Sequence, residues 1–240
     1  MIPTRALKIC LALAFMAAPT SPASAAEAPP KVADTPPAGP RAKPAFSVGG
    51  PVERPDVRPG DRWTYRVTDL LSKLTRTSTL ETTAVTASRI ETRRKAGDGA
   101  TADQGVIEAW DRDWNLLQAA DVKFTPFYPT FRFPLEKDKS WSGSVSWSGS
   151  GVTTQHDLKL RVAGWERVTV PAGTFDAIRV NVRGYIHTTT GSGFGQGTIK
   201  DTMWYAPAIR QIVKHEIDQQ IFRSSFIRNE RWELTGYKTD

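Results

Sequence analysis

Cysteine is almost absent from this chain, in which Cys10 is the single example. Cys10 stands at the front of an apolar run and not at its end, where a lipid-attachment cysteine would lie. Because we expect that run to be removed, the mature protein has no cysteine for disulfides, thiolate zinc sites or thiol catalysis. Its stability must come from buried apolar and aromatic surface, and all eight tryptophans follow residue 60.

Long apolar segments are also missing. The apolar run at residues 9–18 is much shorter than the about 20 residues that cross a bilayer. Arg5 and Lys8 precede it and small residues follow at 23–25, which is the pattern of a cleaved secretory signal peptide. We therefore expect residues 1–25 to be a signal peptide. The mature protein is expected to be periplasmic, with secretion as the alternative, and not transmembrane.

The charge is mildly basic and evenly spread. The chain carries a net charge of +7, and loss of Arg5 and Lys8 with the signal peptide lowers it by two. Basic residues alternate with acidic ones and form no aromatic-interleaved stripe, which argues against nucleic-acid binding. In an exported protein this balance either favours anionic lipid head groups or polysaccharide, or serves solubility alone.

Proline separates two regions of the chain. Residues 26–59 contain nine prolines with alanine and glycine but few large apolar residues. Such a composition cannot bury enough surface to fold, so it predicts a disordered, extended linker. Residues 60–240 have the size and apolar content of a single domain.

Helical periodicity is missing from this domain, and strand periodicity replaces it. Trp63, Tyr65 and Val67 alternate with polar residues, and residues 178–187 alternate between aliphatic and polar or charged side chains. Strands in series with short turns predict an antiparallel sheet that must close, curl or pair with another sheet to protect its edges. We predict an all-β fold, an antiparallel curved half-barrel, with a two-sheet β-sandwich as the alternative.

Four motifs resemble a known family. They are residues 60–65 (GDRWTY), 133–135 (FPL) followed by Trp141, 170–177 (VPAGTFDA), and 203–207 (MWYAP) leading into 213–216 (VKHE). In order and spacing they resemble the TapB-like family, uncharacterised exported proteins of Gram-negative bacteria. Sheets of that family look like incomplete barrels in the style of lipoprotein carriers such as LolA. The resemblance implies a fold and a compartment, and it implies no activity.

Candidates for catalysis are few. His156, His187 and His215 each lie in a strand pattern without a zinc-binding spacing. The serine-rich segment 142–151 has no Gly-x-Ser-x-Gly elbow and precedes no helix. Acidic residues are plentiful, but nothing selects a pair for glycoside hydrolysis. We predict no catalytic residue, no metal site and no cofactor.

Two motifs mimic ligand-binding loops. The Asp-x-Asp-x-Asn sequence at 111–115 starts like a calcium loop but lacks the glycine and glutamate that such a loop needs, so we expect a hairpin turn. Alternate glycines at 191–197 resemble a phosphate-binding loop, yet a strand follows where a helix would be needed. We expect a hairpin tip there, with Phe194 exposed as a contact point.

The segment with the strongest claim to function is residues 124–135, which contain five aromatic residues and three prolines. The prolines argue against a central strand, so these aromatics should lie on a loop or an edge. Either they plug one end of the core or they line a mouth that receives an apolar ligand. In the second case the expected ligand-binding residues are Phe127, Tyr128, Phe131, Trp141 and Trp204.

Three functions follow, in decreasing order of preference. The first is a non-enzymatic envelope protein that binds a lipid or other amphiphile on the concave face of the half-barrel. The second is a protein–protein interaction module of the cell envelope without a small ligand. The third is an envelope hydrolase. An apolar cavity behind residues 124–135 would favour the first, a filled interior with exposed aromatics the second, and converging acidic or histidine side chains in a cleft the third.

Overall fold

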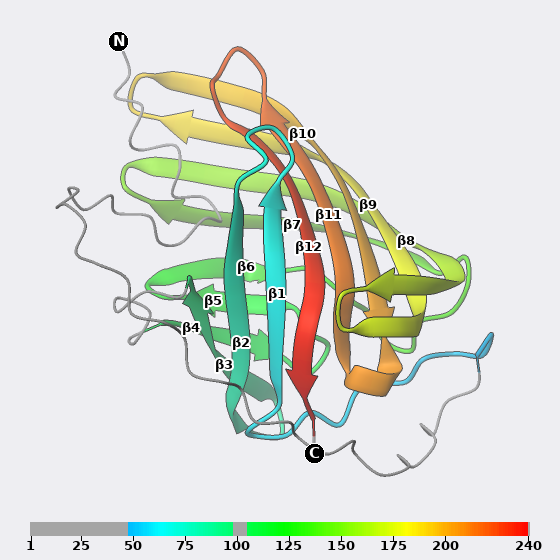
Figure 1. Cartoon of the computed structure of the whole chain (residues 1–240). Helices are drawn as coiled ribbons and strands as arrows, with labels where there is room; N and C mark the ends of the chain where they lie inside the picture. Colours follow the sequence, from blue (N-terminus) through cyan, green and yellow to red (C-terminus); the bar gives the residue numbers. More distant parts are fainter. Residues whose placement is uncertain (1–47, 98–104, 240) are drawn as a thin grey trace, which may run out of the picture.

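A computed structural model of the protein describes residues 48–97 and 105–239 (Figure 1). The expected signal peptide and residues 26–47 of the expected linker lie outside the described residues. The strands are β1 (Arg62–Asp69), β2 (Thr75–Val85), β3 (Arg89–Ala96), β4 (Val106–Asp111), β5 (Leu116–Ala119), β6 (Val122–Tyr128), β7 (Ser140–Gly149), β8 (Val152–Val170), β9 (Gly173–Thr190), β10 (Gly193–Ala206), β11 (Gln211–Ile221) and β12 (Ile227–Lys238), with a 3₁₀ turn, η3 (Pro207–Ile209), before β11. Within these residues no helix is long and apolar enough to span a membrane.

The sheet closes on itself. Each strand pairs antiparallel with its neighbours in the chain, and β1 also pairs with β12. The β1–β12 register runs from Arg62 opposite Lys238 to Asp69 opposite Glu230. The all-β antiparallel class is confirmed, but the half-barrel and the sandwich are both wrong, because the fold is a closed 12-strand barrel. Alternation within a strand shows which face is buried, and it carries no information on whether the first strand meets the last.

The barrel has two different ends. Because neighbouring strands are antiparallel, alternate turns lie at the same end. The end that carries the β1–β2, β7–β8, β9–β10 and β11–β12 turns is called the hairpin end. The other end, called the plugged end, carries η3 and the long connection between β6 and β7.

Inward-facing side chains form the core, as the alternation in β1 predicts. Trp63, Tyr65 and Val67 are all buried and belong to one apolar cluster. The Trp63 indole donates to the carbonyl of Ile209 at 2.9 Å, and the Tyr65 hydroxyl donates to the carbonyl of Ile212 at 2.9 Å. Both polar groups are therefore satisfied inside the core, as buried donors must be.

Residues 48–59 differ from the solvated linker expected of them. Val52 and Val57 are 1% and 2% exposed and belong to the core cluster. Val52 exchanges backbone hydrogen bonds of 2.9 and 2.8 Å with Leu135, and the Trp165 indole donates to the carbonyl of Gly50 at 3.0 Å. This strap covers the plugged end. Two isolated valines among prolines lack the period-two pattern by which a buried strand is recognised.

The strand β6 also departs from expectation, since it contains Pro126. Its register with β7 contains only the pair Thr125 and Ser146, and its register with β5 is interrupted between Leu116 and Gln118. Proline removes one ladder hydrogen bond and is tolerated where few are made.

The rest of the aromatic segment closes the plugged end. Phe131 and Leu135 are 1% and 0% exposed. The side-chain oxygen of Asn115 accepts hydrogen bonds from the backbone N–H groups of Thr130 and Phe131, at 2.7 and 3.1 Å. Asn115 ends the β4–β5 turn, which is the expected hairpin. Of the two interpretations of this segment, the position of Phe131 and Leu135 supports the plug.

Candidate functional site

Polarity changes along the inside of the barrel. The part next to the plugged end is filled by large, fully buried side chains, which include Trp63, Trp114, Phe131, Leu135, Tyr205 and Ile209. Toward the hairpin end, inward positions of β2, β3, β4 and β12 carry charges instead: Arg76, Arg94, Glu108, Arg228 and Glu230. Charges inside a protein must be paired to be tolerated.

Glu230 is the centre of this charged group. Its carboxylate accepts hydrogen bonds from Arg76 at 2.7 Å, from Arg228 at 3.0 Å and from the indole of Trp232 at 3.0 Å. Burial alone would raise the pKa of Glu230, but Arg228 and Arg76 outweigh it and lower the pKa to about 2. Glu230 is therefore ionised at neutral pH.

Trp232 links Glu230 to a second ion pair. The guanidinium groups of Arg76 and Arg94 lie 5.9 and 5.5 Å from its ring centroid. Arg94 also bonds both oxygens of Glu108, at 2.6 and 3.1 Å. The group thus holds four strands together, with Arg228 Nη1 left buried and without a hydrogen-bond partner.

A small cavity lies beside this group at the hairpin end. It is lined by Val152, Thr154, His156, Ile186, Thr188, Gln219, Ile221 and Phe226, and its volume is about 10 Å³. Gln219 stands opposite Arg228 across β11 and β12, which joins the cavity to the charged group. Such a volume suffices for about one water molecule.

His156 is the most unusual residue of the cavity. It is 5% exposed, and its Nδ1 atom is buried without a hydrogen-bond partner. Its ring packs edge-on against Trp147 and Tyr128, at centroid distances of 4.7 and 5.7 Å. Burial lowers the pKa of His156 to about 4, so the imidazole is neutral at pH 7.

The five expected ligand-binding residues do not surround one space. Phe131 and Trp141 are in the core, and Tyr128 packs with Phe124 and Trp147 in a second apolar cluster. Phe127 is 36% exposed. None of the five lines the cavity described above. Their role in ligand binding stays a prediction.

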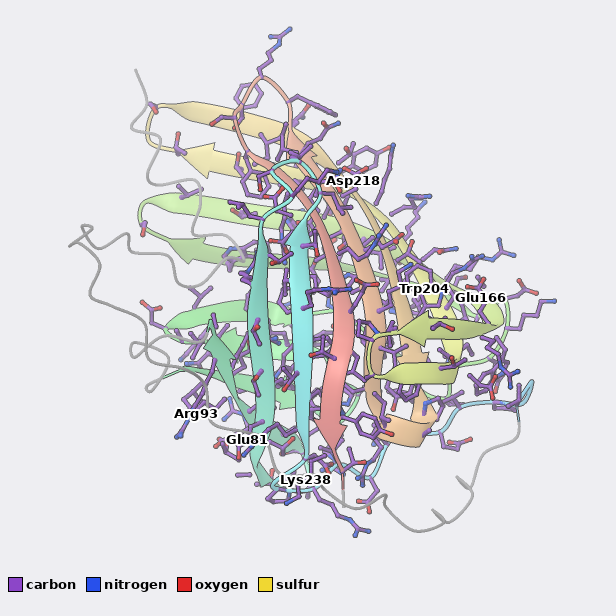
Figure 2. All side chains as sticks on the ribbon, viewed as in Figure 1. Glu81, Arg93, Glu166, Trp204, Asp218 and Lys238 are labelled. Carbon is purple, nitrogen blue, oxygen red and sulfur yellow. The ribbon has the colours of Figure 1, made fainter. Side chains whose placement is uncertain are left out.

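Trp204, the fifth of these residues, is held by polar groups. Its indole donates to Glu166 at 2.7 Å, and the two side chains lie side by side (Figure 2). The ammonium of Lys214 lies 4.6 Å from the ring centroid. These contacts cover Trp204, which is only 8% exposed.

The histidines do not converge. His156 and His215 face inward, whereas His187 lies on the outer face beside Asp157, at 3.4 Å. The hydroxyl of Ser144 donates to the Asp157 carboxylate and not to an imidazole, so Ser144 does not form the serine–histidine pair of a hydrolase triad. Within residues 48–97 and 105–239, no three His, Cys, Asp or Glu side chains form a metal-binding group.

Large apolar side chains are exposed at the hairpin end. They are Leu71 (59%), Leu74 (73%), Tyr185 (63%), Phe194 (85%), Phe222 (51%) and Ile227 (52%), and we call them the apolar patch. Three backbone registers place Tyr185, Thr198, Gln220 and Ile227 in one row on the outer face. The exposure expected for Phe194 is confirmed.

Neighbouring hairpins of the patch are connected by their backbones. The N–H of Leu70 donates to Asn229 at 2.7 Å, which joins the β1–β2 turn to β12. The N–H of Phe222 donates to Gln196 at 2.7 Å, which joins the β11–β12 turn to β10. The three turns are therefore one connected surface.

Sequence reasoning missed both the charged interior and most of the apolar patch. Arg76 stands in phase with the buried Leu80, and Glu230 stands in phase with the buried Leu234. A charge at an inward position of a strand is the signal that would have indicated the charged interior. Phe222 and Ile227 lie out of phase with the buried Ile221 and Leu234, and this outward phase would have indicated part of the apolar patch.

Comparison with known proteins gives a fold and no family. No family model matches the chain, and no curated protein matches it. The chain resembles the crystal structure of a candidate lipoprotein from Parabacteroides distasonis, with a TM-score of 0.51 and 16% identity, over 78% of this chain and 99% of that one. This likeness shows the fold alone.

Two further solved structures are more distant. A candidate exported protein with a YmcC-like fold from Bacteroides fragilis has a TM-score of 0.47 and 18% identity, over 79% of this chain and 100% of that one. The hypothetical lipoprotein YmcC from Escherichia coli has a TM-score of 0.42 and 10% identity, over 75% and 85% of the two chains. None of these likenesses shows a family for this chain, and the TapB-like resemblance is not confirmed.

Proposed function

We propose that this protein is a non-enzymatic docking module of the cell envelope that binds its partner with the outside of its hairpin end. One observation carries the proposal: large apolar side chains are exposed together at the hairpin end, where backbone hydrogen bonds connect three hairpins. Monomeric soluble proteins rarely expose a contiguous apolar patch without a partner for it. Phe194, at 85% exposure on a hairpin tip, is its most prominent member.

The interior gives little support to an amphiphile inside the barrel. Small-molecule sites commonly enclose about 300–1,000 Å³. The cavity near His156 is about 10 Å³, and Phe131 and Trp141 lie in the packed core. We therefore prefer docking through the outer surface, without a small ligand inside the barrel, over the first of the three functions expected from the sequence.

A hydrolase has no site to support it in the described part of the chain. Ser144 is bonded to a carboxylate, and the charges at Glu230 and Glu108 are used by arginines. The solved structures of similar fold are described as lipoproteins or exported proteins, and that supports an envelope location for this chain.

Photo-crosslinking in the native host tests the proposal. A photoreactive amino acid replaces Phe194, and in a matched strain it replaces Thr169, which is exposed in the β8–β9 hairpin at the other end. We expect a discrete crosslinked product from position 194 that position 169 does not give. Equal products from both positions, or none from either, would overturn the docking proposal.

A further inference from the structure

We propose that the partner of the hairpin end is an anionic lipid surface, bound by the apolar patch together with a row of cations on β8, β9 and β10. This inference rests on the docking function proposed above and names the partner. The cations are Lys159, Arg183 and Lys200, which we call the cationic row.

The cationic row consists of three like charges placed side by side. Arg183 is the register partner of Lys159 in β8 and of Lys200 in β10. All three face outward and are exposed. Like charges directly opposite each other on a sheet destabilise it. An anionic partner would remove this cost.

Carboxylates stand near the row without forming an ion pair with it. None of the three cations has a carboxylate within 4.0 Å among the described residues. Asp157, in the next row of β8, accepts hydrogen bonds from Ser144 and Gln155 and lies beside His187. Asp218 on β11 is exposed (Figure 2) and lies opposite Lys200, because it stands between the register pairs Ile199–Gln219 and Thr202–Glu216. Most other outward arginines of β8 and β9 have a carboxylate partner, as Arg161, Arg167 and Arg179 do.

The cationic row shares the outer face with Tyr185, Phe194 and Ile227 of the apolar patch. Tyr185 lies two residues from Arg183 on the outer side of β9, about 7 Å along the strand. The row that contains Tyr185 continues through Thr198 and Gln220 to Ile227. Phe194 lies farther along the same face, about 20 Å from the cationic row at the strand rise. A surface lying along this face meets the aromatic and aliphatic side chains and the cations together.

The chemistry of this face favours lipid over protein. Aromatic rings and leucines on protruding turns can enter the boundary between head groups and acyl chains, which lies about 5–10 Å below the surface. Arg223 is exposed at the same turn as Phe222, where it would meet a phosphate. Clustered lysines and arginines attract anionic head groups through a term that salt screens.

Vesicle flotation with the full exported protein tests the inference. The probes are vesicles of phosphatidylcholine alone and vesicles that contain about 30% phosphatidylglycerol, enough to create a negative surface potential. We expect binding to the anionic vesicles that falls as salt is raised. Equal binding to both vesicle types, or none to either, would overturn the role of the cationic row.

Two sets of variants separate the charge from the apolar patch. Lys159→Gln, Arg183→Gln and Lys200→Gln together should weaken binding to anionic vesicles by about a hundredfold. Phe194→Ser with Phe222→Ser should weaken it at least about tenfold, because two large apolar groups no longer leave water. The control is Arg93→Gln, Lys137→Gln and Lys238→Gln, which makes the same change in charge on exposed positions away from the row; Figure 2 shows Arg93 and Lys238 far from Asp218.

The outcomes distinguish this inference from the docking function on which it rests. Vesicle binding that the control variant keeps and the row variant loses supports the lipid surface. No vesicle binding, together with a crosslink from position 194 to one protein, overturns the lipid surface and leaves docking intact. If the protein shows no vesicle binding and gives no position-specific crosslink, both proposals are overturned.

Discussion

At the scale of single residues, Glu230 is the side chain on which the polar half of the interior depends. Glu230→Gln removes the carboxylate charge that pairs with Arg76 and Arg228 while keeping the shape of the side chain. Because it leaves the guanidinium of Arg228, whose side chain is 11% exposed, without its charge partner, we expect it to lower the free energy of unfolding by about 3 kcal/mol, measured by urea denaturation.

The matched control for this prediction is Glu81→Gln. Glu81 pairs with Arg62 at 2.9 Å on the outer face, where both side chains are partly exposed. Surface pairs contribute about 0–1 kcal/mol. Similar small losses for both variants would show that Glu230 is not enclosed as the structure has it.

His156 gives a second residue-scale prediction, on pH. Its pKa falls from 6.5 to about 4 on folding because burial disfavours the imidazolium. The unfolded chain therefore binds this proton at higher pH than the folded protein does. The stability that neutral His156 contributes is complete above pH 6.5 and is lost as the pH falls toward 4, with roughly 2 kcal/mol lost between about pH 7 and pH 5.

Urea titrations of wild type and His156→Phe at these two pH values check the prediction. The variant, which keeps a ring against Trp147 and Tyr128, should lose less stability on acidification than wild type. His187→Phe, at a histidine whose side chain is 45% exposed, is the control and should behave like wild type. If all three proteins lose the same free energy of unfolding between pH 7 and pH 5, His156 is not the source of this pH dependence.

At the scale of elements, the aromatic segment is held in place by a turn that is distant in sequence. Asn115→Ala removes the acceptor for the backbone N–H groups of Thr130 and Phe131. Leaving two donors unsatisfied should cost about 1–3 kcal/mol. Hydrogen exchange should also become faster across residues 129–139.

The same substitution at Asn181, on the outer face of β9, controls for loss of an asparagine. It should leave exchange at 129–139 unchanged. If Asn115→Ala also leaves that exchange unchanged, the plug is held by packing of Phe131 and Leu135 alone.

How far an element could be predicted depended on how regular its alternation is. The strands β1 and β9 were predictable because Trp63, Tyr65 and Val67, like Ile178, Val180 and Val182, are buried at every second position. The strand β6 was not predictable, because Pro126 argues against a strand, and this strand tolerates proline only since it makes few ladder hydrogen bonds. The strap at residues 48–59 was not predictable either, because Val52 and Val57 are buried by tertiary contacts and follow no local period.

At the scale of the whole molecule, closure of the barrel was beyond the reach of local patterns. The last strand pairs with the first through Arg66 and Glu233, which are register partners and form a salt bridge of 2.9 Å. No pattern within either strand specifies that contact. The same holds for the candidate site, since the charged interior and the apolar patch each collect residues from several distant strands.

Closure itself can be tested with a disulfide. Arg66→Cys with Glu233→Cys, in a chain that also carries Cys10→Ser, should form an intramolecular disulfide, because opposed residues of antiparallel strands lie about 4.5–5.5 Å apart. The bridge closes a loop with a sequence separation of 167 residues and should stabilise the protein by about 4–5 kcal/mol.

Mass analysis under non-reducing conditions reads out the bond, and urea denaturation reads out the gain in stability. Arg62→Cys with Glu233→Cys lies out of register and should not bridge. Free thiols in the in-register variant would mean that β1 and β12 are edges of an open sheet.

The proposed function requires that this barrel acts through its outside and holds no ligand within. Native mass spectrometry of the mature protein isolated from its own host is the decisive measurement. We expect the mass of the polypeptide alone, with no small molecule retained. A reproducible adduct of lipid size, lost when Phe127→Ala and Phe131→Ala are combined, would contradict it and return the search to a ligand inside the barrel.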